Sequence, residues 1–107
     1  MKIFSHIGIP TTIAREGEVY MDGAGVYVTD FHDSANQIEW LRFDEDSPMP
    51  EALKTIAHVA YDVDNLDVAL AGQEILIEPF EAKEGVMVAF ILENGAPVEL
   101  MQTREAS

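Results

Sequence analysis

Two histidines and two glutamates stand at matching places in the two halves of the chain: His6 and Glu39 in the first half, His58 and Glu99 in the second. Imidazole nitrogen and carboxylate oxygen together favour Zn, Ni, Co, Mn or Fe over Ca. Four such ligands around an octahedral ion leave positions for water or a substrate. A structural zinc site more typically uses cysteine, and the chain has none. We therefore predict a divalent-metal site with the ligands His6, Glu39, His58 and Glu99.

The same four residues lie in short segments that repeat. Ser5-His-Ile-Gly-Ile9 is similar to Ala57-His-Val-Ala-Tyr61, and Ile38-Glu-Trp-Leu41 is similar to Val98-Glu-Leu-Met101. The segments occur in the same order in both halves, which indicates a duplicated unit.

Alternation of apolar and polar residues predicts the strands that carry these segments. The expected strands span residues 2–9, 18–21, 26–31, 37–43, 56–63, 74–79, 86–92 and 97–102. One helix is expected at 65–71, with Asp64 as its N-cap and Gly72 at its end, and about one helical turn at 11–17. The sequence thus predicts one α+β domain over residues 1–107, with module one at about 1–45 and module two at about 56–103.

Strand periodicity also predicts which way the four residues face. Successive side chains of a strand point to opposite faces, so Ile7, Trp40, Val59 and Leu100 lie on the face away from them. That face is apolar and needs a helix or a partner to cover it. The face of the four polar residues is mixed in composition. We expect a sheet with one dry side and one concave, partly wet side.

Composition limits the kinds of partner. The 107 residues contain 20 Asp and Glu against 6 Lys and Arg, which gives a formal charge of −14. A nucleic-acid backbone or an anionic membrane surface would be repelled, so neither is an expected partner. Residues 1–12 resemble no signal peptide, and no apolar stretch approaches the ~20 residues that span a bilayer. We expect a cytoplasmic protein with a small-molecule substrate or ligand.

The chain resembles the vicinal oxygen chelate superfamily, which includes glyoxalase I, methylmalonyl-CoA epimerase, extradiol dioxygenases and bleomycin-resistance proteins. The motifs that carry the resemblance are His6–Pro10, Ile38–Trp40, His58–Asn65, Val86–Ile91 and Pro97–Met101. They cover the second half throughout and the first half mainly at its two outer strands. The resemblance implies an α+β fold in which two βαβββ modules form an open, mostly antiparallel barrel around a metal, with the helix of the first module shortened.

By position, His6, Glu39, His58 and Glu99 match the four ligands of the glyoxalase I type. The resemblance therefore implies a divalent-metal-dependent lyase or isomerase that acts on a small carbonyl compound through a metal-stabilised enolate. It implies Glu99 or Glu39 as the catalytic base. It also implies a homodimer.

Two other functions are compatible with the sequence. One is an Fe- or Mn-dependent ring-cleaving dioxygenase, in which His6, His58 and Glu99 form a facial triad and Glu39 does not bind the metal. The other is a non-catalytic binding protein like the bleomycin-resistance proteins, because an acidic groove suits a cationic drug. The third histidine, His32, is expected to be an ordinary surface residue.

Overall fold

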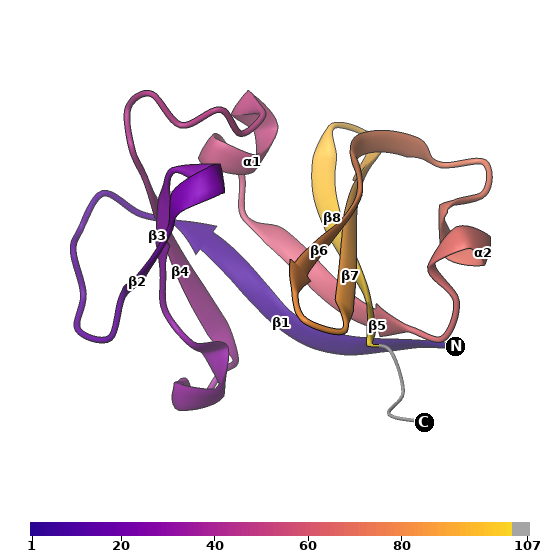
Figure 1. The fold of residues 1–107 in the computed structure, drawn as a ribbon, viewed down its shortest axis with the longest axis horizontal. Helices are drawn as coiled ribbons and strands as arrows, with labels where there is room; N and C mark the ends of the chain where they lie inside the picture. The colour runs from indigo at the N-terminus through magenta and orange to yellow at the C-terminus, as the bar shows by residue number, and fades with distance from the viewer. Residues whose placement is uncertain (104–107) are drawn as a thin grey trace. The chain divides into compact units, whose positions relative to one another are not determined.

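The structure, a computed structural model, describes residues 1–103 as eight strands and a few short helices. The strands are β1 (Lys2–Pro10), β2 (Val19–Met21), β3 (Val26–Val28), β4 (Ile38–Phe43), β5 (His58–Val63), β6 (Glu74–Lys83), β7 (Val86–Glu93) and β8 (Ala96–Thr103). The helices are α1 (Glu51–Thr55), α2 (Leu66–Leu70) and the 3₁₀ turns η1 (Asp22–Ala24) and η2 (Phe31–Asp33) (Figure 1). Each expected strand is present, although β2, β3, β4 and β5 are shorter than predicted and the other strands are longer.

The chain divides into two compact units, which we describe separately. Residues 6–58 form one, here called the His6–His58 unit. Residues 1–5 and the chain from residue 59 onward form the other, here called the C-terminal unit. Strands β1 and β5 each contribute residues to both units.

Both units place their first and last strands side by side. In the His6–His58 unit β1 pairs with β4 in parallel, and β4, β3 and β2 follow one another antiparallel. In the C-terminal unit β5 pairs with β8 in parallel, and β8, β7 and β6 follow antiparallel. The hydrogen-bonded order is β2-β3-β4-β1 in the His6–His58 unit and β5-β8-β7-β6 in the C-terminal unit. The α+β class is therefore confirmed, as mixed sheet with few short helices.

The helices depart from the predictions. No helix, not even a shortened one, occupies residues 11–18, which form bends and turns. The hydroxyl of Thr11 accepts a hydrogen bond from the Ile13 amide at 3.1 Å, and this local contact competes with a helical turn. In contrast, α1 was not predicted. It begins after Pro50 and holds one buried residue, Leu53, and it delays the start of the next strand to His58.

The N-cap of α2 was assigned to the wrong residue. The carboxylate of Asp64 pairs with the N-terminal ammonium of Met1 at 3.2 Å. The side chain of Asn65 instead caps the helix, accepting a hydrogen bond from the Val68 amide at 3.1 Å. Within residues 1–103, no helix has the length and apolar character needed to cross a membrane.

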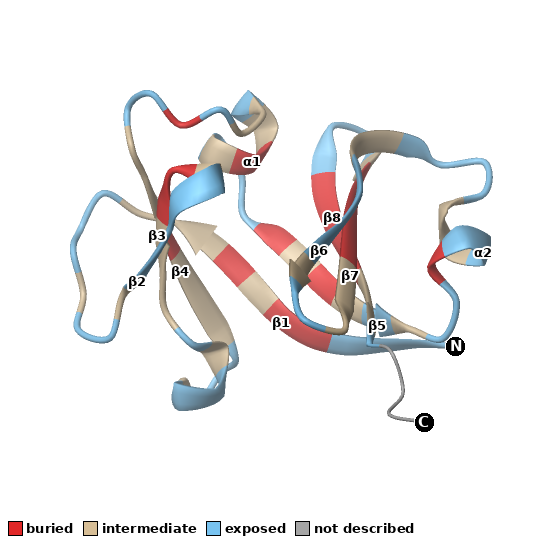
Figure 2. Cartoon of the chain, viewed as in Figure 1, coloured by how far each residue is buried: buried red, intermediate tan, exposed pale blue. Residues whose placement is uncertain are grey.

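The face expected to be wet is the more buried one on β1 and β5. His6 and Gly8 are buried whereas Ile7 is only half-buried, and His58 is buried whereas Val59 is half-buried (Figure 2). The prediction of a dry apolar face was thus wrong for these strands. The physical reason is the shortage of helix. In the C-terminal unit only the five-residue α2 packs against the apolar face, around a core of Leu66, Ala89, Ile91, Val98 and Leu100.

Candidate metal centre

The four residues predicted from the sequence to bind a metal are His6, Glu39, His58 and Glu99, and a group of side chains that could hold a metal ion is found among them. Three of them belong to the His6–His58 unit. One ligand atom of each of these three lies within 4.8 Å of the others. An ion of ordinary size can therefore contact all three with small side-chain movements.

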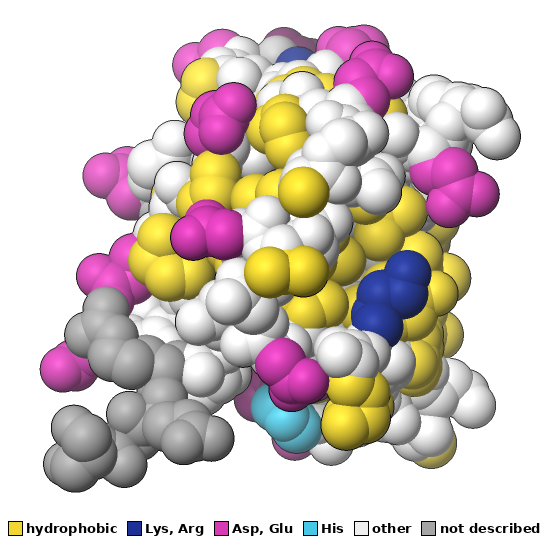
Figure 3. Space-filling view, turned by 90° about the vertical axis from the view of Figure 1, so that its right-hand side faces the viewer, with side chains coloured by type: hydrophobic (Ala, Val, Ile, Leu, Met, Phe, Trp, Pro, Cys, Tyr) yellow, Lys and Arg dark blue, Asp and Glu magenta, His cyan; other side chains and the backbone are white. Residues whose placement is uncertain are grey.

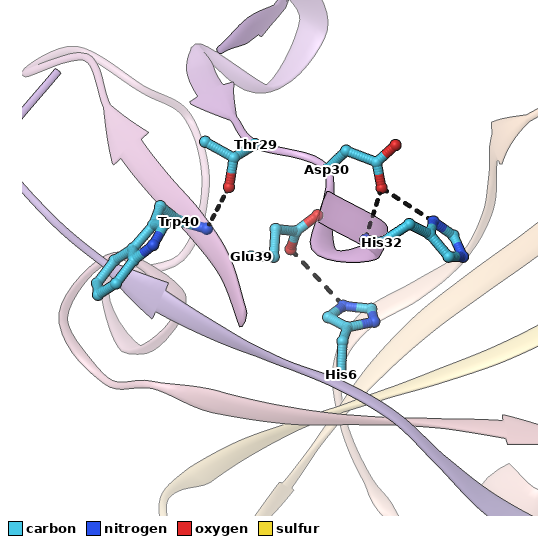
Figure 4. A network of polar contacts seen from close by, with 6 residues as sticks. All are labelled: His6, Thr29, Asp30, His32, Glu39 and Trp40. Atoms are coloured by element: carbon cyan, nitrogen blue, oxygen red, sulfur yellow. Dashed lines mark hydrogen bonds and ion pairs between the residues drawn. The ribbon is translucent and has the colours of Figure 1, made fainter. Parts of the chain in front are cut away.

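Parallel pairing of β1 and β4 brings His6 and Glu39 together. The register sets Gly8 beside Glu39, and His6 lies two residues earlier on the same face of β1. His6 Nε2 is 3.7 Å from Glu39 Oε1, a distance beyond hydrogen bonding but suited to two ligands of one ion (Figure 4). The side chain of His6 is 3% exposed and that of Glu39 is 20% exposed, so the carboxylate retains some access to solvent.

His58 is the first residue of β5 and is fully buried, with 2% of its surface exposed. Its ring lies edge-on to the ring of His6, with the centroids 6.2 Å apart and the planes at 78°. The ring also lies against Gly8 of β1, where no side chain intervenes. Two imidazoles thus converge on the place where the Glu39 carboxylate lies.

An aromatic residue that the sequence analysis did not single out covers His6. The ring of Phe31 stacks on the His6 imidazole, with 4.1 Å between the centroids and 15° between the planes. Phe31 had been assigned to the end of a strand, but β3 ends at Val28. The carboxylate of Asp30 accepts a hydrogen bond from the His32 amide at 2.9 Å and starts the η2 turn, which places Phe31 over the site.

The same turn is tied to the sheet and exposes the third histidine. Thr29 Oγ1 accepts a hydrogen bond from the Trp40 amide at 2.9 Å, which fixes the chain before η2 to β4 (Figure 4). His32 Nδ1 lies 2.9 Å from Asp30 Oδ1 and its side chain is 74% exposed. The prediction that His32 is a surface residue is confirmed.

Glu99, the fourth predicted ligand, belongs to the C-terminal unit. It lies on β8 directly beside Ala60 of β5, and it is 9% exposed. The register gives Glu99 the same face of the β5–β8 pair as its partner Ala60.

The donor set fits a divalent ion. Two imidazole nitrogens and carboxylate oxygens are the ligands that Zn, Ni, Co, Mn and Fe share. Buried charges in proteins are paired or coordinate metals, because an isolated charge is costly to remove from water. A dication offsets the charges of two carboxylates in a chain that already carries a net charge of −14.

A separate groove lies in the C-terminal unit, on the apolar face of the sheet. It has a volume of about 540 Å³ and is lined by Tyr61, Val98 and Leu100, among others. None of the four candidate ligands lines it. Lys2 also lines the groove, and its ammonium lies 4.4 Å from the centre of the Tyr61 ring. Figure 3 views the molecule from the side on which α2 lies in Figure 1. It shows hydrophobic side chains between scattered acidic ones.

Two other contacts of the His6–His58 unit perturb acid–base groups. Arg42 binds Glu18 through two hydrogen bonds, of 2.9 Å and 2.7 Å, and this contact lowers the pKa of the Glu18 carboxyl. The hydroxyl of Tyr20 donates a 2.6 Å hydrogen bond to Asp44, which together with desolvation raises the pKa of Tyr20 to about 12. Both contacts lie outside the candidate metal-ligand group, and we interpret them as structural.

No protein-family model and no curated protein matches the chain. Among solved structures, the chain is similar to the crystal structure of a hypothetical protein, BH1468 from Bacillus halodurans C-125. The two have a TM-score of 0.71 and 21% sequence identity, over 99% of this chain and 97% of that one. This likeness shows the fold alone. The function must therefore be argued from the site.

Proposed function

We propose that the chain is a divalent-metal-dependent lyase or isomerase of the glyoxalase type, and a member of the vicinal oxygen chelate superfamily. The observation that carries the proposal is the grouping of the Glu39 carboxylate with the imidazoles of His6 and His58 within 4.8 Å. The further arrangement of two related modules as an open barrel is part of this proposal, with α2 after the first strand of the second module and no helix at residues 11–18, after the first strand of the first.

In this proposal His6, Glu39 and His58 hold the ion, and Glu99 completes the ligand set. A bound divalent ion would supply Lewis-acid polarisation of a carbonyl oxygen and so make the neighbouring carbon more acidic. The chain's own contribution is a carboxylate that takes a proton from the carbon beside the carbonyl and returns one later. Glu99 and Glu39 are the two candidates, because each lies in the ligand group and neither is fully exposed.

Participation of Glu39 favours this chemistry over ring cleavage by oxygen. The oxygenase alternative needs two histidines, one carboxylate and open positions on the metal. Glu39 Oε1 lies 3.7 Å from His6 Nε2, close enough to occupy one of those positions. A fourth protein ligand reduces the room for oxygen and a chelating catechol together.

The charge of the chain favours a small, weakly charged substrate. Only 6 Lys and Arg stand against 20 Asp and Glu, so a polyanion such as a CoA thioester would meet few cations. We also propose a cytoplasmic homodimer. Ile7 and Ile9 of β1 and Tyr61 of β5 are apolar but only half-buried. Their remaining exposed surface supports the proposal that a partner chain covers them.

Proton exchange tests the proposed chemistry without knowledge of the product. Wild-type protein is loaded with Ni, Co, Zn, Mn or Fe and incubated in D₂O with a panel of small α-hydroxy- and α-dicarbonyl compounds. NMR should show exchange of the hydrogen beside the carbonyl that requires the ion. His58→Ala should abolish the exchange, whereas the matched surface variant His32→Ala should keep it. Absence of exchange with every metal would contradict the proposal.

A further inference from the structure

Each imidazole of the candidate site packs against a neighbouring residue that is not itself a candidate metal ligand. The ring of His58 occupies the space that a side chain at position 8 would fill. A Cβ built on Gly8 would collide with His58 Cε1 and would lie 2.6 Å from Nε2 and 2.8 Å from Nδ1. Because His58 is fully buried, its ring cannot simply swing into solvent to make room.

Position 8 requires a glycine because a side chain would not fit there, and not because of the backbone conformation. Gly8 lies in the interior of β1, and it is absent from the residues with positive φ. Glycine inside a strand otherwise weakens it, and it often marks a close approach by another group. The close approach here is the His58 ring, and the register also places the site residue Glu39 directly beside Gly8.

Phe31 restrains the other imidazole. Its ring lies nearly parallel to that of His6, with 4.1 Å between the centroids. Rotation of the imidazole about its side-chain bonds would break this stacking. The η2 turn that presents Phe31 is itself fixed by the Asp30 cap and by the hydrogen bond from Trp40 to Thr29.

We propose that Gly8 and Phe31 are positioning residues, which hold the imidazoles of His58 and His6 in ligand orientation before any metal binds. This inference rests on the proposed metal site and adds to it the source of its preorganisation. Groups that orient metal ligands from outside typically contribute about 10–100-fold to metal affinity.

Metal affinity and ring orientation test the inference together. Zn²⁺ dissociation constants are measured by competition with a chromophoric chelator for wild type, Gly8→Ala and Phe31→Leu. Both variants should bind Zn²⁺ about 10–100-fold more weakly, and Phe31→Tyr, which keeps the ring, should bind as wild type does. Gly23→Ala is the matched control, because a Cβ at Gly23 meets nothing within 4 Å.

NMR of the metal-free protein supplies a readout independent of metal. The ring protons of His6 should be shifted upfield by the Phe31 ring, and the shift should disappear in Phe31→Leu and persist in Phe31→Tyr. The His58 ring should show a nuclear Overhauser effect to the Gly8 Hα protons. If the His6 ring loses its fixed orientation in Phe31→Leu while the far-UV circular dichroism is unchanged, the variant has lost ring positioning and not its fold.

A double variant guards against a Gly8→Ala protein that is merely unstable. Removal of the His58 ring removes the collision, so stability lost in Gly8→Ala should be recovered when Gly8→Ala is made in the His58→Ala background. Failure of this recovery overturns the role of Gly8. Wild-type-like Zn²⁺ affinity in Gly8→Ala and Phe31→Leu, with binding lost in His6→Ala, overturns the inference and leaves the proposed function standing. Absence of binding of Zn, Ni, Co, Mn and Fe alike by the wild type overturns both.

Discussion

The carboxylate of Glu39 and the imidazole of His6 face each other from two neighbouring parallel strands, with 3.7 Å between Oε1 and Nε2. The pairing joins residues that are far apart in sequence, because the first and last strands of the unit lie side by side. Strand alternation then places the side chains on one face. This relationship turns two separate sequence motifs into one ligand group, and His58 adds the second imidazole to it.

Tyr20 is expected to ionise only at unusually high pH. Its hydrogen bond to Asp44 raises its pKa from 10.0 to about 12. In the unfolded chain the phenol loses its proton near pH 10.0, so the stability from this contact is complete below that pH and is lost between there and about pH 12. Phenolate absorbance should show a transition at about pH 12. In Asp44→Asn that transition should move toward pH 10.0, and an unchanged titration would contradict the assignment.

Glu18 is expected to contribute stability above its ordinary pKa. The Arg42 guanidinium lowers the pKa of the Glu18 carboxyl below 4.5 in the folded chain. Stability from this pair is therefore present above pH 4.5 and is lost as the pH falls through the lowered folded value. Urea unfolding across this range should show a flatter acid limb for Glu18→Gln than for wild type. The exposed neighbour Glu16, changed to Gln, provides the control for the loss of one negative charge.

Removal of the α2 cap should cost measurable stability. Asn65 accepts a hydrogen bond from the Val68 amide, and loss of such a cap typically costs ~1 kcal/mol. Asn65→Ala should therefore lower the free energy of unfolding by about that amount in urea titrations. Asp64→Ala should cost less, since Asp64 makes only an exposed ion pair with the N-terminus among the contacts described. The reverse order would restore Asp64 as the cap.

Leu100 is expected to be a principal core residue of the C-terminal unit. It is 2% exposed and belongs to the cluster with Leu66, Ala89 and Val98. Leu100→Ala should destabilise the protein by about 2–5 kcal/mol, through lost burial and the cavity left behind. Val68→Ala, at a position that is 71% exposed, should change stability by no more than about 0.5 kcal/mol. Calorimetry of the two variants distinguishes them, and similar melting temperatures would contradict this description of the core.

Sequence patterns predicted the strands and the grouping of His6, Glu39 and His58 because both depend on local periodicity. The repeated His and Glu segments needed only strand pairing to converge, and the pairing of first and last strands supplied it. The pattern could not predict which face is buried, since that depends on how much helix covers the sheet. It also missed Phe31, whose placement depends on the hydrogen bonds from the His32 amide to Asp30 and from the Trp40 amide to Thr29. The loss of the helical turn at residues 11–17 likewise follows from a local side-chain contact of Thr11.

Metal content tests the central claim most directly. Tag-free protein is reconstituted with each of Zn, Ni, Co, Mn and Fe, freed of excess ion and analysed for metal per chain, beside Glu39→Gln, His6→Ala and His32→Ala. The account predicts about one tightly held ion in the wild type and in His32→Ala. It predicts none in His6→Ala and, in Glu39→Gln, an affinity reduced by more than about tenfold, or ~1.4 kcal/mol. A wild-type protein that retains no metal, or variants that retain as much as the wild type, would contradict it.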